Sequence, residues 1–259
     1  MHVTEAGRGR PLIFLHGWSC HGGFFAPQAA GLRDRFHLLF PDLPGHRNSP
    51  ARTGDLSIGF MADALHRVIA ERGLQNAVLV GWSMGALVAF DYIARHGSAA
   101  LGGLVIADMT PKITNDTGWS LGIRGGFDMA QSMAAVLAMQ ADWPAYAGAF
   151  VPRIFARSGC HDPALQDWAA AQILYNDPGA MAALWASMAA CDYRPLMPRL
   201  DMPVLILHGG ESQLYDPAVS LWLEAEIPAA RRHCLAAAGH APHLEMPAAF
   251  NAALSDFVS

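Results

Sequence analysis

Short continuous apolar runs alternate along the chain with longer segments of helical periodicity. The runs are Pro11–Leu15, Phe36–Phe40, Ala77–Val80, Gly103–Ala107 and Pro203–Leu207. Because apolar residues fill successive positions, each run is typical of a strand that is covered on both faces of a sheet. The segments that predict helices are Ile58–Glu71, Met84–His96, Ala218–Glu226 and Pro247–Phe257. This alternation predicts an α/β fold with a mostly parallel sheet and helices on both of its faces.

The segment from Thr114 to Pro198 interrupts this alternation. It contains no strand-like run, it is rich in Ala, Met and Trp, and it is divided by Pro144, Pro152, Pro163 and Pro178. We expect several short helices here. Because strand-like segments resume at Pro203, we interpret residues 114–198 as a helical lid inserted into a core of residues 1–113 and 199–259. A separate helical domain is the alternative.

Composition and charge narrow the class of protein. The 259 residues are 53% hydrophobic and 15% charged, which indicates a globular chain rather than a disordered one. The net charge of −5 does not favour nucleic-acid binding. No apolar stretch reaches the ~18 residues of a membrane span, and the N-terminus lacks signal-peptide features. The four cysteines form no CxxC pair, which indicates free thiols and a cytoplasmic location.

A candidate nucleophile lies between a predicted strand and a predicted helix. Gly81-Trp82-Ser83-Met84-Gly85 follows the run Ala77–Val80 and begins the helical segment, which is the context of a G-x-S-x-G nucleophile elbow. The serine has to sit on a sharp turn, so bulky side chains at the flanking glycine positions would clash with the neighbouring backbone. The start of the helix would also offer free N–H groups to a developing oxyanion.

Two further segments offer the partners that a serine nucleophile needs. His16-Gly17-Trp18 follows the first strand-like run, so the Trp18 N–H is our candidate for an oxyanion-hole donor, paired with the Met84 N–H. A serine hydroxyl is a weak nucleophile unless an imidazole takes its proton. His240, in a loop after Gly239, is our candidate general base, whereas His243 is expected to pack nearby.

These motifs resemble the α/β-hydrolase superfamily in order and spacing. The matching segments are His16-Gly17-Trp18, Pro41-Asp-Leu-Pro-Gly-His46, Gly81-Trp-Ser-Met-Gly85 and Gly239-His240. The chain looks like a serine carboxylesterase of this superfamily. Within it, several segments are similar to pimeloyl-acyl-carrier-protein methyl ester esterases. The resemblance implies Ser-acid-His catalysis through an acyl-enzyme, with neither cofactor nor metal. It also implies a structural role for Asp42 in its loop.

The acid of the triad is where this sequence departs from the family pattern. The usual aspartate follows the strand Pro203–Leu207, but Ser212 occupies that position here. Some α/β hydrolases carry the acid one strand earlier, in a D-x-x-P segment, and Asp108-Met-Thr-Pro111 is the corresponding segment. We therefore predict Asp108 as the acid that orients His240. Glu211 is the first alternative and Asp216 the second.

The leading hypothesis is hydrolysis of carboxylic esters of small to medium apolar acyl groups by Ser83, Asp108 and His240. One alternative keeps this triad but acts on a C–C bond, a lactone or peroxide. A second alternative is a ligand receptor with weak turnover, which only the serine at position 212 supports. The expected partner is a small ester, possibly linked to a carrier protein. Arg153 and Arg157, on one helical face, would contact such a carrier, although a solvated face is the simpler interpretation.

Overall fold

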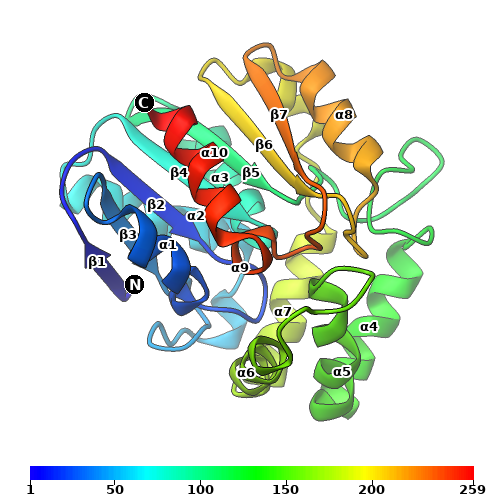
Figure 1. Cartoon of the computed structure of the whole chain (residues 1–259). Helices are drawn as coiled ribbons and strands as arrows, with labels where there is room; N and C mark the ends of the chain where they lie inside the picture. The colour runs from blue at the N-terminus through cyan, green and yellow to red at the C-terminus, as the bar shows by residue number, and fades with distance from the viewer.

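The computed structural model describes residues 1–259 and contains one seven-stranded sheet (Figure 1). The strand order is β1-β3-β2-β4-β5-β6-β7, and every neighbouring pair is parallel except β1 with β3. The strands are β1 Val3–Ala6, β2 Pro11–Leu15, β3 His37–Pro41, β4 Ala77–Trp82, β5 Leu101–Ala107, β6 Val204–Gly209 and β7 Ala230–Leu235. The prediction of a mostly parallel sheet is confirmed.

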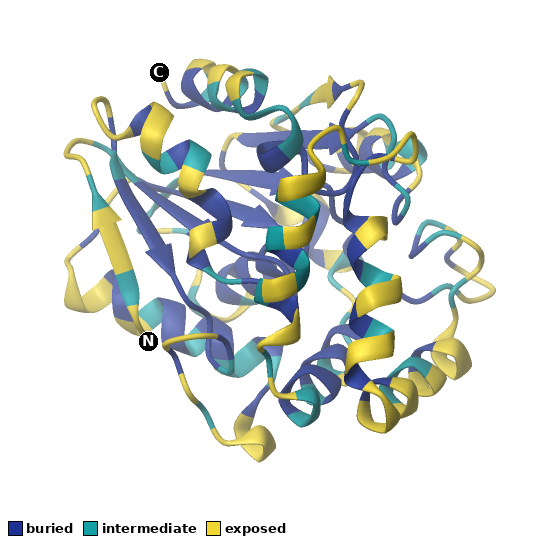
Figure 2. Cartoon of the chain, turned by 60° about the horizontal axis from the view of Figure 1, so that its bottom comes forward, coloured by how far each residue is buried: buried dark blue, intermediate teal, exposed yellow.

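The central strands are apolar at successive positions because both of their faces are covered. Every residue of β4 and β6 is buried, and Figure 2 shows the central strands as buried in the interior of the molecule. The sequence analysis missed β1 and β7, which form the two edges of the sheet. These edge strands are largely solvent-exposed, so they carry polar residues such as the Arg231-Arg232-His233 run and lack the apolar signature.

Helices surround the sheet. They are α1 Ala26–Leu32, α2 Ile58–Glu71, α3 Met84–His96, α8 Pro217–Glu226, α9 Pro242–Glu245 and α10 Pro247–Val258, with 3-10 helices η1 Gly22–Phe25 and η2 Thr53–Asp55. Of these, α2, α3, α8 and α10 have bounds close to the predicted ones. Helix α2 packs against α3, and α1 packs against α10. No helix combines the length and the apolar character that crossing a membrane requires.

The chain between β5 and β6 is helical, as expected, and contains no strand. It forms α4 Met129–Ala141, α5 Trp143–Phe150, η3 Val151–Ile154, α6 Pro163–Leu174, α7 Pro178–Ala189 and η4 Arg194–Arg199. Helices α4 to α7 lie together at one end of the sheet (Figure 1). An aspartate caps the N-terminus of each of α5, α6 and α7, and a proline follows within its first two residues. The prolines therefore mark helix starts.

Candidate active site

Ser83 lies on a tight turn between β4 and α3. Its backbone is left-handed, with φ 54°, a conformation that non-glycine residues rarely adopt. The turn is fixed because the Ser83 N–H donates to the carbonyl of Ala107 at 3.1 Å and its carbonyl accepts from the N–H of Ala86 at 2.8 Å. The side chain therefore projects from the carboxyl end of the sheet, where open α/β folds bind ligands.

The flanking glycines of the elbow are required by close backbone contacts, as the sequence analysis predicted. A Cβ atom at Gly81 would lie 2.5 Å from the Cα of Ala86. One at Gly85 would lie 2.0 Å from the carbonyl oxygen of Leu15. Both contacts are with backbone atoms, which a rotamer change cannot relieve.

The structure brings Ser83, His240 and Asp108 together from three separate loops. The Nε2 atom of His240 lies 2.9 Å from the Ser83 Oγ, and its Nδ1 lies 2.7 Å from the Asp108 Oδ2. Asp108 directly follows β5 and His240 follows β7. With Nδ1 protonated and donating to Asp108, the Nε2 lone pair accepts from the serine hydroxyl. All three residues are buried, so water does not compete for these hydrogen bonds.

Neither alternative acid contacts His240. The Glu211 carboxylate accepts a hydrogen bond from the N–H of Ser158 at 2.8 Å, and hydrogen bonding first to the side chain and then to the backbone of Ser158 lowers its pKa. Asp216 caps α8 by accepting from the N–H of Ala218 at 3.0 Å. Each carboxylate therefore has a structural partner elsewhere.

Two backbone N–H groups close to Ser83 have no acceptor. The hydrogen bonds of turns and loops use neither the Trp18 N–H nor the Met84 N–H. The Trp18 loop approaches Ser83 closely, because a Cβ atom at Gly17 would lie 3.3 Å from the Ser83 Cβ. The indole of Trp18 donates to the carbonyl of Met181 in α7 at 2.9 Å, which fixes the loop against the inserted helices.

Buried histidines, in their neutral form, accept hydrogen bonds that hold the surrounding loops in place. His16 Nε2 accepts from the N–H of Leu43 at 2.9 Å, and His46 Nε2 accepts from the N–H of Ser19 at 3.2 Å. Burial lowers the pKa of His46 to about 4, so it keeps this acceptor near neutral pH. As expected, His243 packs nearby, against the rings of Phe25 and Trp82.

The Asp42 carboxylate also organises this region. Its Oδ1 accepts from the N–H of Gly22 at 3.0 Å, and its Oδ2 accepts from the Asn48 side chain at 3.0 Å. The carboxylate thus joins the loop after β2 to the loop after β3, in line with the structural role that the resemblance implied.

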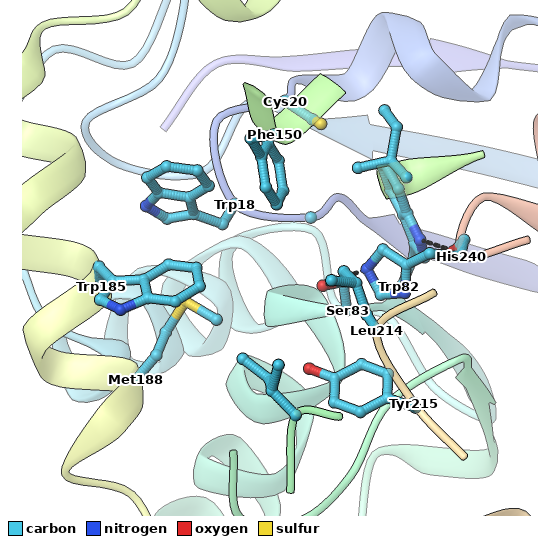
Figure 3. A pocket seen from close by; sticks show the side chains of 13 residues that line it. Trp18, Cys20, Trp82, Ser83, Phe150, Trp185, Met188, Leu214, Tyr215 and His240 are labelled. Carbon is cyan, nitrogen blue, oxygen red and sulfur yellow. Dashed lines mark hydrogen bonds between the residues drawn. The ribbon is translucent and has the colours of Figure 1, made fainter. Parts of the chain in front are cut away.

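An apolar pocket adjoins Ser83 and His240 (Figure 3). Thirteen residues line it, and ten of them are hydrophobic. They are Gly17, Trp18, Cys20, Trp82, Ser83, Ile123, Phe150, Ile154, Trp185, Met188, Leu214, Tyr215 and His240. No lysine, arginine, aspartate or glutamate is among them. An uncharged, apolar group therefore fits this space best.

The structure divides the aromatic residues of segment 114–198, which the sequence could not do. Phe150 and Trp185 face the pocket, whereas Trp119, Trp143 and Phe155 are buried without lining it. The suggested pairing of two arginines on one helical face is wrong. Helix η3 ends at Ile154, so Arg157 lies in the turn beyond the helix that contains Arg153.

The sequence analysis gave no role to two side chains that belong to the site. The Trp82 indole donates to the backbone carbonyl of His240 at 2.6 Å, which anchors the histidine loop. Its position inside the elbow motif was a usable signal. Tyr215 lines the pocket, and its hydroxyl has only the Met109 sulfur, at 3.1 Å, as a partner. Nothing in the local sequence distinguishes that tyrosine.

The sheet order, the strand–turn–helix elbow and the Ser-His-Asp grouping define the class of α/β-hydrolase folds. A family model described as "Alpha/beta hydrolase family" matches residues 12–253, and the chain belongs to this family.

Individual relatives agree with this assignment. A pimeloyl-[acyl-carrier protein] methyl ester esterase of Chromobacterium violaceum is 28% identical over 260 residues, covering 99% of this chain and 97% of the relative. An esterase structure from Exiguobacterium antarcticum has a TM-score of 0.93 at 24% identity, covering 99% of this chain and 94% of that one. An esterase structure from Rhodococcus sp. ECU1013 has a TM-score of 0.84 at 27% identity, covering 99% and 93%.

Proposed function

We propose that this chain is a serine esterase that hydrolyses carboxylic esters of small to medium apolar acyl groups. The observation that carries the proposal is the continuous hydrogen-bonded line from Ser83 through His240 to Asp108, with bonds of 2.9 and 2.7 Å, at the edge of an apolar pocket. The names of the relatives support an ester as the substrate.

In the proposed mechanism, the Ser83 Oγ attacks the ester carbonyl while His240 Nε2 takes the hydroxyl proton. The negative oxygen that forms accepts hydrogen bonds from the Trp18 N–H in the loop after β2 and from the Met84 N–H at the start of α3. The imidazolium donates its Nδ1 proton to the Asp108 carboxylate in a hydrogen bond and passes its Nε2 proton to the leaving alcohol. Water then attacks the acyl-enzyme with His240 as the base, which releases the acid and restores Ser83.

We propose that residues 114–198 act as a lid that shapes the acyl site. Helix α7 contributes Trp185 and Met188 to the pocket, and the segment around η3 contributes Phe150 and Ile154. These side chains cover the edge of the sheet where Ser83 lies. A carrier-linked ester, such as the one named for the first relative, stays a prediction for this chain.

The receptor hypothesis depended on the serine at position 212. Because Asp108 lies at hydrogen-bond distance from His240, it supports a catalytic function and not a receptor function.

Hydrolysis of p-nitrophenyl esters, from acetate to long acyl chains, tests the proposal. We expect Ser83→Ala to abolish turnover and Asp108→Asn to lower kcat by about 10⁴-fold, because the imidazole loses its orienting anion. Glu211→Gln and Asp216→Asn are matched controls that also remove a carboxylate charge, and both should retain most of the activity. Wild-type turnover no faster than that of Ser83→Ala on every ester would refute the esterase. A collapse in Glu211→Gln with an active Asp108→Asn would refute the assignment of the acid.

A further inference from the structure

The Asp108 carboxylate has a side-chain partner besides His240. The Ser212 hydroxyl lies 2.7 Å from Asp108 Oδ2, the same oxygen that accepts from His240 Nδ1. The other oxygen, Oδ1, accepts from the backbone N–H of Gly209 at 3.2 Å. Only 2% of Ser212 is exposed, so no solvent replaces its hydroxyl as a donor.

We propose that Ser212 is a positioning residue that holds the Asp108 carboxylate in the orientation that His240 requires. This inference rests on the proposed Ser-His-Asp function. Ser212 does not touch the reacting atoms, and its effect reaches them only through Asp108. Ser212 occupies the sequence position at which the family pattern has the acid, and there it supports the acid Asp108.

The surrounding backbone fixes the direction of the Ser212 proton. A serine hydroxyl has one proton and two acceptor lone pairs. The N–H groups of Leu214 and Tyr215 both point at the Ser212 Oγ, at 3.3 and 3.2 Å. With its lone pairs occupied, the hydroxyl has its proton left for Asp108. Ser212 is therefore a donor to the carboxylate and not a competing acceptor for His240.

The carboxylate needs this support because its terminal torsion is soft. The χ2 of an aspartate has a broad distribution, so the carboxylate plane can turn. Three donors, from His240, Ser212 and Gly209, define that plane here. Without the Ser212 hydroxyl, Oδ2 keeps only the histidine as a partner, and the plane can follow thermal motion of the imidazole.

Charge explains why a serine fits position 212 while the acid is at position 108. An aspartate at 212 would bring a second carboxylate to within hydrogen-bond distance of Asp108, and two such groups cannot both stay ionised at low cost. A hydroxyl supplies a hydrogen bond without adding charge. The same turn also carries Leu214 and Tyr215 into the pocket, so the acid and the pocket wall share one support.

The test measures kcat and KM on a p-nitrophenyl ester for Ser212→Ala, Ser212→Thr, Asp108→Asn and the double variant Asp108→Asn/Ser212→Ala. We expect Ser212→Ala to lower kcat about tenfold, the usual size of a hydrogen bond to a charged group, with KM changed less than twofold. Threonine, which keeps the hydroxyl, should restore most of kcat. In the Asp108→Asn background, Ser212→Ala should have almost no further effect, because its partner charge is already absent.

Ser220→Ala is the matched control. The Ser220 hydroxyl is also buried and donates to the carbonyl of Pro217 at 2.7 Å, within α8. We expect this variant to keep wild-type kcat. If Ser212→Ala does not fold, Ser212→Cys retains the side-chain volume with a much weaker donor, and it should show most of the same loss.

Three outcomes would overturn the role of Ser212: unchanged kcat in Ser212→Ala, an equal tenfold loss in the Asp108→Asn background, or the same loss in Ser220→Ala. These outcomes differ from failure of the proposed function, in which Ser83→Ala and Asp108→Asn would themselves keep wild-type turnover.

Discussion

Two residues of the candidate triad have backbone conformations that their side chains disfavour. Ser83 has φ 54° and Asp108 has φ 45°, and they are two of only five non-glycine residues with positive φ. Both follow directly on the carboxyl end of a strand, where a left-handed residue turns the chain sharply. Such conformations persist only when the surroundings fix them, and they concentrate at functional sites. The torsions thus independently mark Ser83 and Asp108 as special positions.

Gly85 gives the sharpest prediction at the residue scale. In Gly85→Ala, the new Cβ would lie 2.0 Å from the Leu15 carbonyl oxygen, so the elbow and β2 must separate. We expect a loss of at least 2 kcal/mol in the free energy of unfolding, comparable to overpacking a core, together with most of the esterase activity. Denaturant titration and ester hydrolysis measure the two effects.

Gly148→Ala is the control for this substitution. A Cβ at Gly148, inside α5, would meet no atom within 4 Å. There the alanine should stabilise the protein by about 0.5 to 1 kcal/mol, because glycine is a poor helix former. If both variants changed the free energy of unfolding equally, the close contact at Gly85 would not explain the effect of Gly85→Ala.

At the scale of elements, the central strands and long helices were predictable because their signals are local. Residues 58–71 and 84–96 have the predicted helix bounds, and the apolar runs became β2 to β6. Ser83 and His240 were predictable from motifs beside these elements. Asp108 was predicted from its D-x-x-P segment, but Glu211 and Asp216 stayed open as alternatives, since the choice depends on which carboxylate the fold brings to His240. The role of Ser212 depends on the same long-range approach.

The pocket lining could not be predicted for a different physical reason. Helices α4 to α7 are apolar on most of their surface, so periodicity does not separate the residues that face the core from those that face the ligand site. On α4, for example, Met133 and Leu137 are exposed although they are apolar, while Met139 is buried. Only the packing of α7 against the core shows that Trp185 and Met188 line the pocket.

Helix α7 therefore gives a prediction about acyl-chain length. Trp185 and Met188 are three positions apart, so they lie on one face of the helix, and both line the pocket. Truncating either to alanine should move the chain-length optimum of the p-nitrophenyl series to longer acyl groups. Each added methylene that becomes buried contributes about 0.8 kcal/mol, or roughly fourfold in kcat/KM.

Leu174→Ala is a control for this prediction, because Leu174 is an exposed apolar residue at the end of α6 and does not line the pocket. Its chain-length profile should match that of the wild type. If Trp185→Ala and Met188→Ala also keep the wild-type optimum, the acyl group occupies another site.

At the scale of the whole molecule, buried histidines link stability to pH. Burial lowers the pKa of His46 to about 4 and that of His243 to about 3, from an ordinary value of 6.5. As the pH falls, His46 and His243 are therefore protonated in the unfolded chain before they are protonated in the folded protein. The stability contributed by the neutral histidines is complete above pH 6.5 and is lost as the pH falls toward the folded-state pKa values. Between pH 7 and pH 5, each should account for a loss on the order of 2 kcal/mol.

Glu245 changes the pH dependence of stability in the direction opposite to that of the buried histidines. Its carboxylate accepts from the N–H groups of Ala156 and Gly239, both at 2.7 Å, but burial still raises its pKa to about 6 from 4.5. The folded protein thus retains the Glu245 proton more strongly than the unfolded chain. Stability from this group increases as the pH falls through 6, which partly offsets the histidines. For these three groups together, the expectation is a loss of stability below about pH 6.5.

His243→Phe isolates one part of this pH dependence. Neither ring nitrogen of His243 has a hydrogen-bond partner, and its ring packs against Phe25, Trp82 and Phe250, so an apolar ring suits the site. We expect guanidinium titrations to show that the free energy of unfolding of His243→Phe falls less between pH 7 and pH 5 than that of the wild type, by about 2 kcal/mol. A His243→Phe variant with the full wild-type loss would show that the buried imidazole at position 243 does not contribute to acid sensitivity.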